Sequence, residues 1–311
     1  MNVNISKHLR IVARNPTTFI RLYSTNNSDK NGVNYCANVV RQHDYENFLA
    51  TLLMTKAIRS PALVVRAFNV EVARVQDVTS DPKVADFRLQ FWLDTLNEIY
   101  NPGQSLKNIP ANPVAQELYK VCSTYKLPRR HLEKLISSRS TLLKTKYFRS
   151  MEDVERYAED TVSSVFYLIL SIANVKSVYA DHAASHLGKA QGIVNILRSL
   201  QVSSHHKMVS LPMDILMKND ISQETVLRCI DSDKMRNVTF EIASRANHHL
   251  TKARSITVPK IVNQILLPAV FVDAYLQKLQ IQHFNVFSKI LQLRTPTLPF
   301  QLYYKRLLNK Y

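Results

Sequence analysis

The sequence predicts an all-α protein with one large domain. Apolar residues recur at three- and four-residue spacing through most of the 311 residues, which is the period of a helix that buries one face. No convincing alternation of apolar and polar residues, and no Asn-Gly turn between two apolar runs, indicates a sheet. Apolar residue types make up 46% of the chain, which is enough for a sizeable core.

The first half of the chain holds five runs with helical spacing, and prolines lie between them or at their starts. The runs cover residues 37–58, 62–75, 84–100, 113–125 and 130–143. The prolines that we expect to act as breakers or first-turn residues are Pro61, Pro82, Pro102, Pro110 and Pro128.

Three segments of the second half have distinct characters. Residues 161–175 are uncharged for 15 residues, shorter than the roughly 20 that a membrane span needs, so we expect a buried core helix. Residues 258–281 contain Pro268 and predict a kinked helix. The tail, Thr295 to Tyr311, predicts a basic amphipathic segment, suited to a membrane surface or to a partner protein.

The N-terminus has the composition of a mitochondrial transit peptide. Residues 1–28 contain no Asp or Glu but four Lys or Arg residues, and the RLYS run at 21–24 resembles a processing site cut after Tyr23. The expected organisation is a transit peptide at 1–23, a flexible linker at 24–34 and a helical domain at 35–311.

The chain is strongly basic. Its net charge of +17 becomes +13 without the four cations of the leader, and such a charge favours an acidic neighbour. Basic clusters at 129–131, 144–149 and 305–306 are most simply solvated faces, and they lack the aromatic-and-glycine pattern of an RNA-recognition strand. In a mitochondrial protein an anionic membrane is the next interpretation, and nucleic acid is the least favoured partner.

Composition also excludes several classes of site. The four glycines form no GxGxxG or GxxxxGK[ST] motif, which argues against a glycine-rich phosphate loop. The cysteines form no CxxC unit, so neither a disulfide framework nor a zinc knuckle is indicated; they are Cys36, Cys122 and Cys229. His182 and His186 share a helix face, but no third metal ligand is apparent, so a solvated face is the simpler interpretation.

Residues 187–212, LGKAQGIVNILRSLQVSSHHKMVSLP, resemble the second signature of squalene and phytoene synthases. The family pattern LGxAxQxxNILRDVxEDxxxGRxYLP aligns without a gap, and its frame is kept at Gly188, Asn195 and Arg198. The two family aspartates that hold magnesium fall on Ser199 and Ser203. Magnesium prefers carboxylate oxygens, and a serine hydroxyl supplies no charge. The glycines of the signature, Gly188 and Gly192, are expected to permit close helix packing.

The first aspartate cluster of the family, with a pattern like AFCRxADDIxD, has its best local match at residues 67–77, AFNVEVARVQD. This register places Ala73 at the first metal aspartate and keeps Asp77 at the later one, while Glu71 is close enough for a shifted register to use it. The resemblance therefore implies an incomplete metal site.

Further frame residues come from two other segments. Arg88 and Trp92 in RLQFW are similar to the RxxxW segment of the family, and Tyr157 begins a match in a later helix. We expect Trp92 to be a core anchor, with Phe91 helping to fill the interior. Phe166 stands where the cleft wall is normally thin, which predicts a narrower or filled pocket.

The resemblance implies an isoprenoid-synthase-type helical bundle around a central cleft. Together, AFNVE, RLQFW, YAED and NILRSL resemble a mitochondrial branch of the family that is non-catalytic and assists early assembly of respiratory complex I. The implied partners are complex I subunits or assembly intermediates. The mechanism would be binding of a membrane subunit or of a lipid-like ligand, in peripheral contact with the matrix side of the inner membrane and without a catalytic residue, metal or cofactor.

Two alternatives remain. A diverged transferase of prenyl diphosphates would recruit Glu71, Asp77, Glu155 or Glu159 for magnesium, and these carboxylates would then converge on one cleft opposite Ser199. The simpler interpretation of Glu155 and Glu159 is favourable interaction with a helix start. The other alternative is an organellar RNA-binding protein, whose binding would fall steeply with salt.

Overall fold

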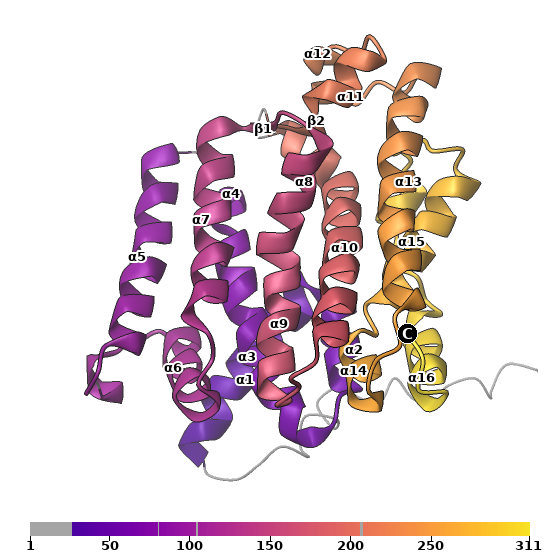
Figure 1. Ribbon diagram of the computed structural model, residues 1–311. Helices are drawn as coiled ribbons and strands as arrows, with labels where there is room; N and C mark the ends of the chain where they lie inside the picture. Colours follow the sequence, from indigo (N-terminus) through magenta and orange to yellow (C-terminus); the bar gives the residue numbers. More distant parts are fainter. Residues whose placement is uncertain (1–26, 80, 104, 206–207) are drawn as a thin grey trace, which may run out of the picture.

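The computed structural model describes residues 27–79, 81–103, 105–205 and 208–311, and helices dominate it (Figure 1). The α-helices of the first half are α1 Asn27–His43, α2 Tyr45–Leu52, α3 Lys56–Ala73, α4 Val75–Val78, α5 Pro82–Tyr100, α6 Pro113–Tyr125, α7 Arg129–Thr145 and α8 Met151–Ala158. Those of the second half are α9 Ser164–Ile172, α10 Val178–His205, α11 Met213–Lys218, α12 Gln223–Leu227, α13 Asp233–Ser255, α14 Lys260–Ile265, α15 Ala269–Ile281 and α16 Leu298–Leu307. The remaining elements are the 3-10 turns η3 Leu106–Asn108 and η5 Lys289–Gln292, the π-helical turn η4 Glu159–Ser163, and strands β1 Tyr147–Phe148 and β2 Val209–Pro212.

The all-α prediction is confirmed. Helices α5, α7, α8, α10 and α13 stand side by side across the view, and α3 lies behind them (Figure 1). The two strands form one short parallel pair at the end of the bundle where α8 begins.

Helix α10 is the central element, and small residues let its neighbours approach closely. Ala183, Ala184 and Ala190 are completely buried along it. A Cβ atom added to Gly188 would lie 2.7 Å from the backbone Cα and N of Ser163, so only glycine allows this approach. The prediction that the signature glycines serve close helix packing is thereby confirmed.

Helix boundaries differ from the sequence prediction in the first segment. Residues 37–58, expected to be one helix, belong to α1, α2 and the start of α3. Asp44 separates the first two helices, and its carboxylate accepts a hydrogen bond from Asn47 at 2.8 Å. Pro61 lies inside α3 rather than at its start. It donates no hydrogen bond to the Ala57 carbonyl, which accepts one from the Tyr125 hydroxyl at 3.4 Å.

The second half is also more segmented than expected. Residues 258–281 form two helices, because Pro268 is the residue before α15 and α14 has already ended at Ile265. Residues 161–175 contribute to η4 and the buried helix α9, as predicted. Among the described residues, no helix combines the length and apolarity needed to cross a membrane.

The N-terminal expectations have different outcomes. The predicted transit peptide, 1–23, lies outside the described residues. Of the predicted linker, 24–34, the residues from Asn27 onward belong to α1. Cys36 and Val40 of the same helix are completely buried, and this packing favours continuation of the helix toward the N-terminus.

Candidate functional site

A cavity of about 930 Å³ lies among α3, α4, α7, α8, α9 and α10. Its apolar lining includes Leu142, Val165 and Phe166, and polar side chains cover the rest. Phe166 is 1% exposed and forms part of the wall. The pocket is not filled, because a cavity of about 930 Å³ remains beside Phe166, and a narrowing by this ring stays a prediction.

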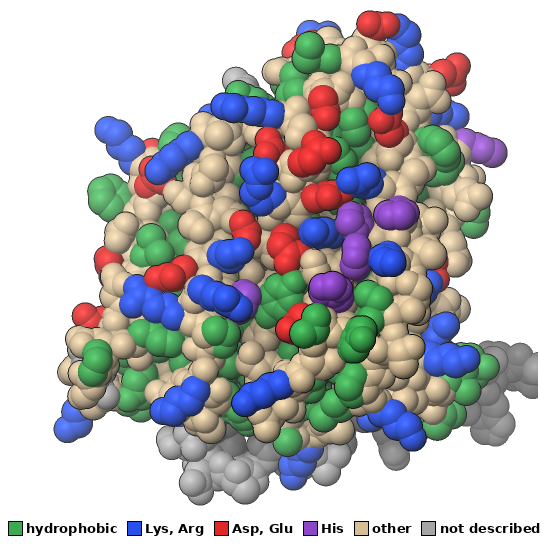
Figure 2. Space-filling view, in the orientation of Figure 1, with side chains coloured by type: hydrophobic (Ala, Val, Ile, Leu, Met, Phe, Trp, Pro, Cys, Tyr) green, Lys and Arg blue, Asp and Glu red, His purple; other side chains and the backbone are tan. Residues whose placement is uncertain are grey.

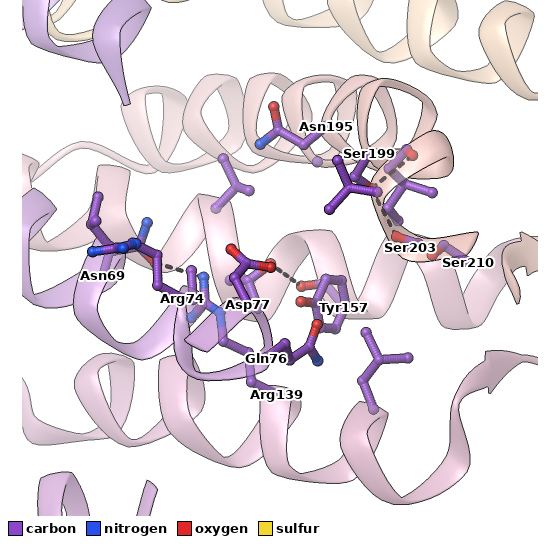
Figure 3. Close-up of a pocket in the computed structure, with 18 of the residues that line it drawn as sticks. Asn69, Arg74, Gln76, Asp77, Arg139, Tyr157, Asn195, Ser199, Ser203 and Ser210 are labelled. Atoms are coloured by element: carbon purple, nitrogen blue, oxygen red, sulfur yellow. Dashed lines mark hydrogen bonds between the residues drawn. The ribbon is translucent and has the colours of Figure 1, made fainter. Parts of the chain in front are cut away.

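The cavity collects most of the residues predicted from the two family signatures. Ala73 and Asp77 line it from α3 and α4, and Tyr157 lines it from α8. The contributions of α10 are Asn195, Arg198, Ser199 and Ser203. Figure 3 shows the serines at one end of the view, Asn69 and Arg74 at the other, and Asp77 and Tyr157 between them.

The two serines at the magnesium positions make local hydrogen bonds. The Ser199 hydroxyl donates to the Ile196 carbonyl at 3.0 Å, one turn back on α10. The Ser203 hydroxyl donates to the oxygen of Ser199 at 3.5 Å, and Ser203 is 5% exposed. These hydroxyls therefore present polar but uncharged atoms to the cavity.

A buried arginine that the sequence analysis missed also faces this cavity. Arg66 on α3 is 3% exposed, and its Nε and Nη2 atoms have no hydrogen-bond partner among the described residues. Burial lowers the pKa of its guanidinium to about 10, opposed in part by the charge of Asp44. Burial likewise raises the pKa of Asp44. Two unsatisfied, charge-bearing donors in a cavity are suited to an anion.

A second buried arginine is held by its neighbours. Arg139 on α7 donates to the Leu135 carbonyl at 2.6 Å and to Asn69 Oδ1 at 2.7 Å, and it is hydrogen-bonded to Tyr157. Burial lowers the pKa of Arg139 and raises that of Tyr157. This group fixes the relative positions of α3, α7 and α8 at the cavity wall.

Four further buried polar atoms around the same space have no hydrogen-bond partner within the described part of the chain. They are Asn47 Oδ1, Gln76 Nε2, Gln191 Oε1 and Ser210 Oγ, and all four residues line the cavity. Buried polar groups without a partner cost about 1–3 kcal/mol each, and they are commonly satisfied by a ligand or by water. The set offers both donors and acceptors.

Arg198 closes one side of the cavity through an ion pair. Its Nη2 atom lies 2.8 Å from Glu46 Oε1, which joins α10 to α2. Glu46 and Asp44 are carboxylates of the lining that the sequence analysis missed, because neither belongs to a recognisable signature. Their positions follow from the break between α1 and α2.

The four carboxylates of the enzyme alternative do not converge. Asp77 lines the main cavity, whereas Glu71 lines a separate hollow of about 350 Å³. Glu155 forms an ion pair with Arg245 on α13. Glu159 accepts hydrogen bonds from the Tyr167 and Ser185 hydroxyls at 2.6 and 2.7 Å. Glu155 and Glu159 thus connect helices, and the helix-start interpretation of this pair is wrong.

The RLQFW segment also lies at the second hollow. Arg88 and Trp92 line it together with Glu71. Trp92 is 4% exposed and packs edge-on against Phe68 with ring centroids 5.2 Å apart, which confirms the expected core anchor. Phe91 is 40% exposed, so the expectation that it fills the interior is wrong.

Histidines gather on the face formed by α10 and α13, among Lys and Arg side chains (Figure 2). His186 Nδ1 lies 2.9 Å from His249 Nδ1, and His249 Nε2 lies 3.1 Å from Glu155 Oε1. His186 is therefore packed against α13 and is not simply part of a solvated face. Among the residues that the structure describes, no group of three or more His, Cys, Asp or Glu side chains could hold a metal ion.

The main cavity is lined by side chains of both charges. The cations include Arg66, Arg74 and Arg139, and the carboxylates are those of Asp44, Glu46, Asp77 and Asp81. The positions that the family pattern predicts for metal ligands carry Ser199 and Ser203, whose hydroxyls supply no charge. The neighbouring guanidinium groups would repel a divalent cation and attract an anion.

Comparison with known proteins places the chain in a family. The squalene/phytoene synthase family model matches residues 40–299, so the chain belongs to that family. Two solved structures share its fold at 16% sequence identity. A dehydrosqualene synthase in complex with ligand has a TM-score of 0.74, with 90% of this chain and 97% of that chain covered. A squalene synthase from Alicyclobacillus acidocaldarius has a TM-score of 0.71, with 86% and 99% covered.

Within the family, the similarity is higher to proteins with another role. The chain is 41% identical to the Homo sapiens protein named NADH dehydrogenase (ubiquinone) complex I, assembly factor 6, over 86% of this chain and 80% of the human one. It is 38% identical to the Drosophila melanogaster homologue, with 91% and 86% covered. Identity to a phytoene synthase from Rhodobacter capsulatus is 24%, with 68% and 61% covered.

Proposed function

We propose that this protein is a non-catalytic, mitochondrial assembly factor for respiratory complex I that acts at an early stage. The observation that carries the proposal is 41% identity to the human complex I assembly factor 6 over 86% of the chain. A relative in Dictyostelium discoideum with the same name, 29% identical over 89% of the chain, supports a role that is shared beyond animals.

The proposed mechanism is binding rather than chemistry. Ionisation of a prenyl diphosphate needs divalent cations to neutralise the leaving group. In the alignment with the family signature, Ser199 and Ser203 stand at the positions of such ligands, and both line the cavity together with Asp77 and Arg74. The cavity is instead suited to an anionic, lipid-like ligand whose head group would satisfy the free donors of Arg66. In the alternative form of this binding mechanism, the protein binds a membrane subunit of complex I and not a lipid-like ligand.

We further propose that the protein works at the matrix side of the inner membrane as a peripheral protein. The net charge of the chain, +17 with the predicted leader and +13 without its four cations, would favour anionic lipid at that surface. This location would bring the protein to membrane subunits of complex I while they are being inserted.

Deletion of the protein followed by native-gel analysis tests the assembly role. We expect the amount of complex I to fall, with early intermediates missing or stalled, while the other respiratory complexes stay near normal. Re-expression of the unmodified chain is the control and should restore complex I. Normal complex I in the deletion strain would contradict the proposal.

The enzyme alternative is favoured by the carboxylates that line the cavity, namely Asp77 together with Asp44 and Glu46. It predicts magnesium-dependent turnover of farnesyl or geranylgeranyl diphosphate, whereas the binding mechanism predicts none. Product analysis with the purified protein separates the two. A Ser199→Asp, Ser203→Asp variant should tighten magnesium binding without full activity, because Arg66 and Arg139 remain. Turnover by the unmodified protein would overturn the non-catalytic proposal.

A further inference from the structure

Helix α16 is amphipathic, and one of its faces is anchored to the bundle. Leu298 and Leu302 are 3% and 0% exposed. The Arg306 guanidinium donates to the Leu53 carbonyl at 3.0 Å, so this basic side chain is also held on the inner side. The spacing of four residues between these positions follows one helix face. The orientation of α16 is therefore fixed by the core and by a hydrogen bond.

The opposite face of α16 presents large apolar and aromatic side chains to the outside. Phe300, Tyr303, Tyr304 and Leu307 are 78%, 62%, 60% and 71% exposed. Their spacing of three, one and three residues places them on one stripe of the helix. Leu308, 46% exposed, extends the stripe beyond the last helical residue. Such a contiguous exposed apolar patch indicates a surface that is covered by something else in the functional state.

The surroundings of this stripe are basic. Residues 274–311 contain no Asp or Glu and six Lys or Arg residues. Exposed Lys310 lies just after α16, whereas the half-buried Lys305 lies on the inner face with Leu298. Exposed Lys260 begins the neighbouring α14, whose Asn263 side chain donates to the Asn309 carbonyl at 2.8 Å. A stripe of Phe, Tyr and Leu within a rim of lysines is complementary to a layer that is apolar inside and anionic at its edge.

We infer that the outward face of α16 docks on the surface of an anionic lipid bilayer. Phe300 and Leu307 enter the boundary between head groups and acyl chains, the tyrosine hydroxyls stay at head-group level, and the lysines contact lipid phosphates. The helix, Leu298–Leu307, then lies in the plane of the membrane. The inference deepens the peripheral membrane location proposed above and rests on it, but it does not depend on the assembly role.

Binding to lipid vesicles tests this inference directly. The full chain should bind phosphatidylcholine vesicles that contain cardiolipin, and binding should weaken as salt is raised. The affinity of a Phe300→Glu, Leu307→Glu variant for these vesicles should fall by roughly tenfold or more, because the variant places two anions in the docking face. Both side chains are exposed, so the fold should be retained, which circular dichroism and thermal unfolding can verify.

A matched control comes from the other edge of the bundle. Phe87 on α5 is 74% exposed and lies far from α16 in the fold (Figure 1). Phe87→Glu should leave vesicle binding unchanged. The inference is overturned if the unmodified chain does not bind these vesicles, a result that would point to a protein partner for α16. It is also overturned if the α16 variant binds the vesicles as tightly as the unmodified chain. Rescue of complex I by each variant is measured separately, so failure of membrane docking is distinguishable from failure of the assembly role.

Discussion

At the scale of single residues, the free guanidinium donors of Arg66 define what the cavity can hold. A charged donor without a partner in a buried position is costly, and a bound anion would remove that cost. The positive charge of the same residue would also repel a divalent cation placed in this cavity.

The residue-level prediction is that Arg66 mediates metal-independent binding of an anionic amphiphile. Farnesyl phosphate in excess chelator should raise the unfolding temperature of the protein, as about 2.7 kcal/mol of stabilisation is expected at a ligand concentration 100 times Kd. Arg66→Gln should abolish the shift, whereas Arg88→Gln, in the separate hollow, should keep it. A shift that requires magnesium, or that survives in Arg66→Gln, would argue against anion binding here.

Gly188 allows a second residue-level prediction. Gly188→Ala should destabilise the fold by about 1–3 kcal/mol or more, because the new methyl group meets the backbone of Ser163. Gly103 has a φ of +81° and nothing within 4 Å, so Gly103→Ala should cost about 1 kcal/mol through backbone strain alone. Chemical denaturation measures both. If both variants lose the same small amount of unfolding free energy, α10 and η4 can move apart to accept the new methyl group.

At the scale of elements, α8, α10 and α13 are joined through Glu155, His186 and His249. Burial, followed by the charge of His249, lowers the pKa of His186 to about 4, and burial lowers the pKa of His249. In the unfolded chain these histidines have a pKa of about 6.5. Between that pH and about 4 the unfolded state binds more protons than the folded state, so the free energy of unfolding should fall as pH is lowered.

The measurement is denaturant unfolding across this pH window. His186→Asn keeps a hydrogen-bonding group near His249 and removes the titrating imidazole. The slope of the unfolding free energy with pH should therefore fall by the equivalent of up to roughly one bound proton. His182→Asn changes an exposed histidine of the same helix and serves as the control. If His186→Asn shows the same pH dependence as the unmodified protein and the control, the titration of His186 does not contribute to the pH dependence of stability.

Much of the element order could be predicted from the sequence, because amphipathic periodicity reports burial along one helix face. The run at 113–125 matches α6 at both ends, and the run at 130–143 lies within α7. The breaks around α2 could not be predicted, since Asp44 and Asn47 end one helix and begin the next by a side-chain contact within an apolar run. Pro61 misled the prediction because a tyrosine from another helix satisfies the freed carbonyl.

The candidate site was predictable only in part for the same physical reason. The signature pattern located Asn195, Ser199 and Ser203 at the cavity, because a short motif keeps its residues on one helix face. Arg66 and Gln191 acquire their importance from tertiary burial without a partner, which no local pattern encodes. Glu71, by contrast, lies on α3 like Ala73 but lines the separate hollow.

At the scale of the whole molecule, the fold of a prenyl synthase family encloses a cavity and carries a basic, partly apolar surface at α16. A ligand in the cavity and a membrane at α16 would place the protein where membrane subunits are assembled. In this account, the protein is needed while complex I is built and is not a component of the finished enzyme.

Acute depletion of the protein with pulse labelling of newly made complex I subunits tests this claim most directly. We predict that incorporation of label into complex I falls, while NADH oxidation per pre-existing complex I stays constant. Rescue with Ser199→Ala should restore incorporation, because the hydroxyl of Ser199 bonds to its own helix. Unchanged incorporation together with lower activity per complex would show that the protein acts on finished complex I, which contradicts an assembly role.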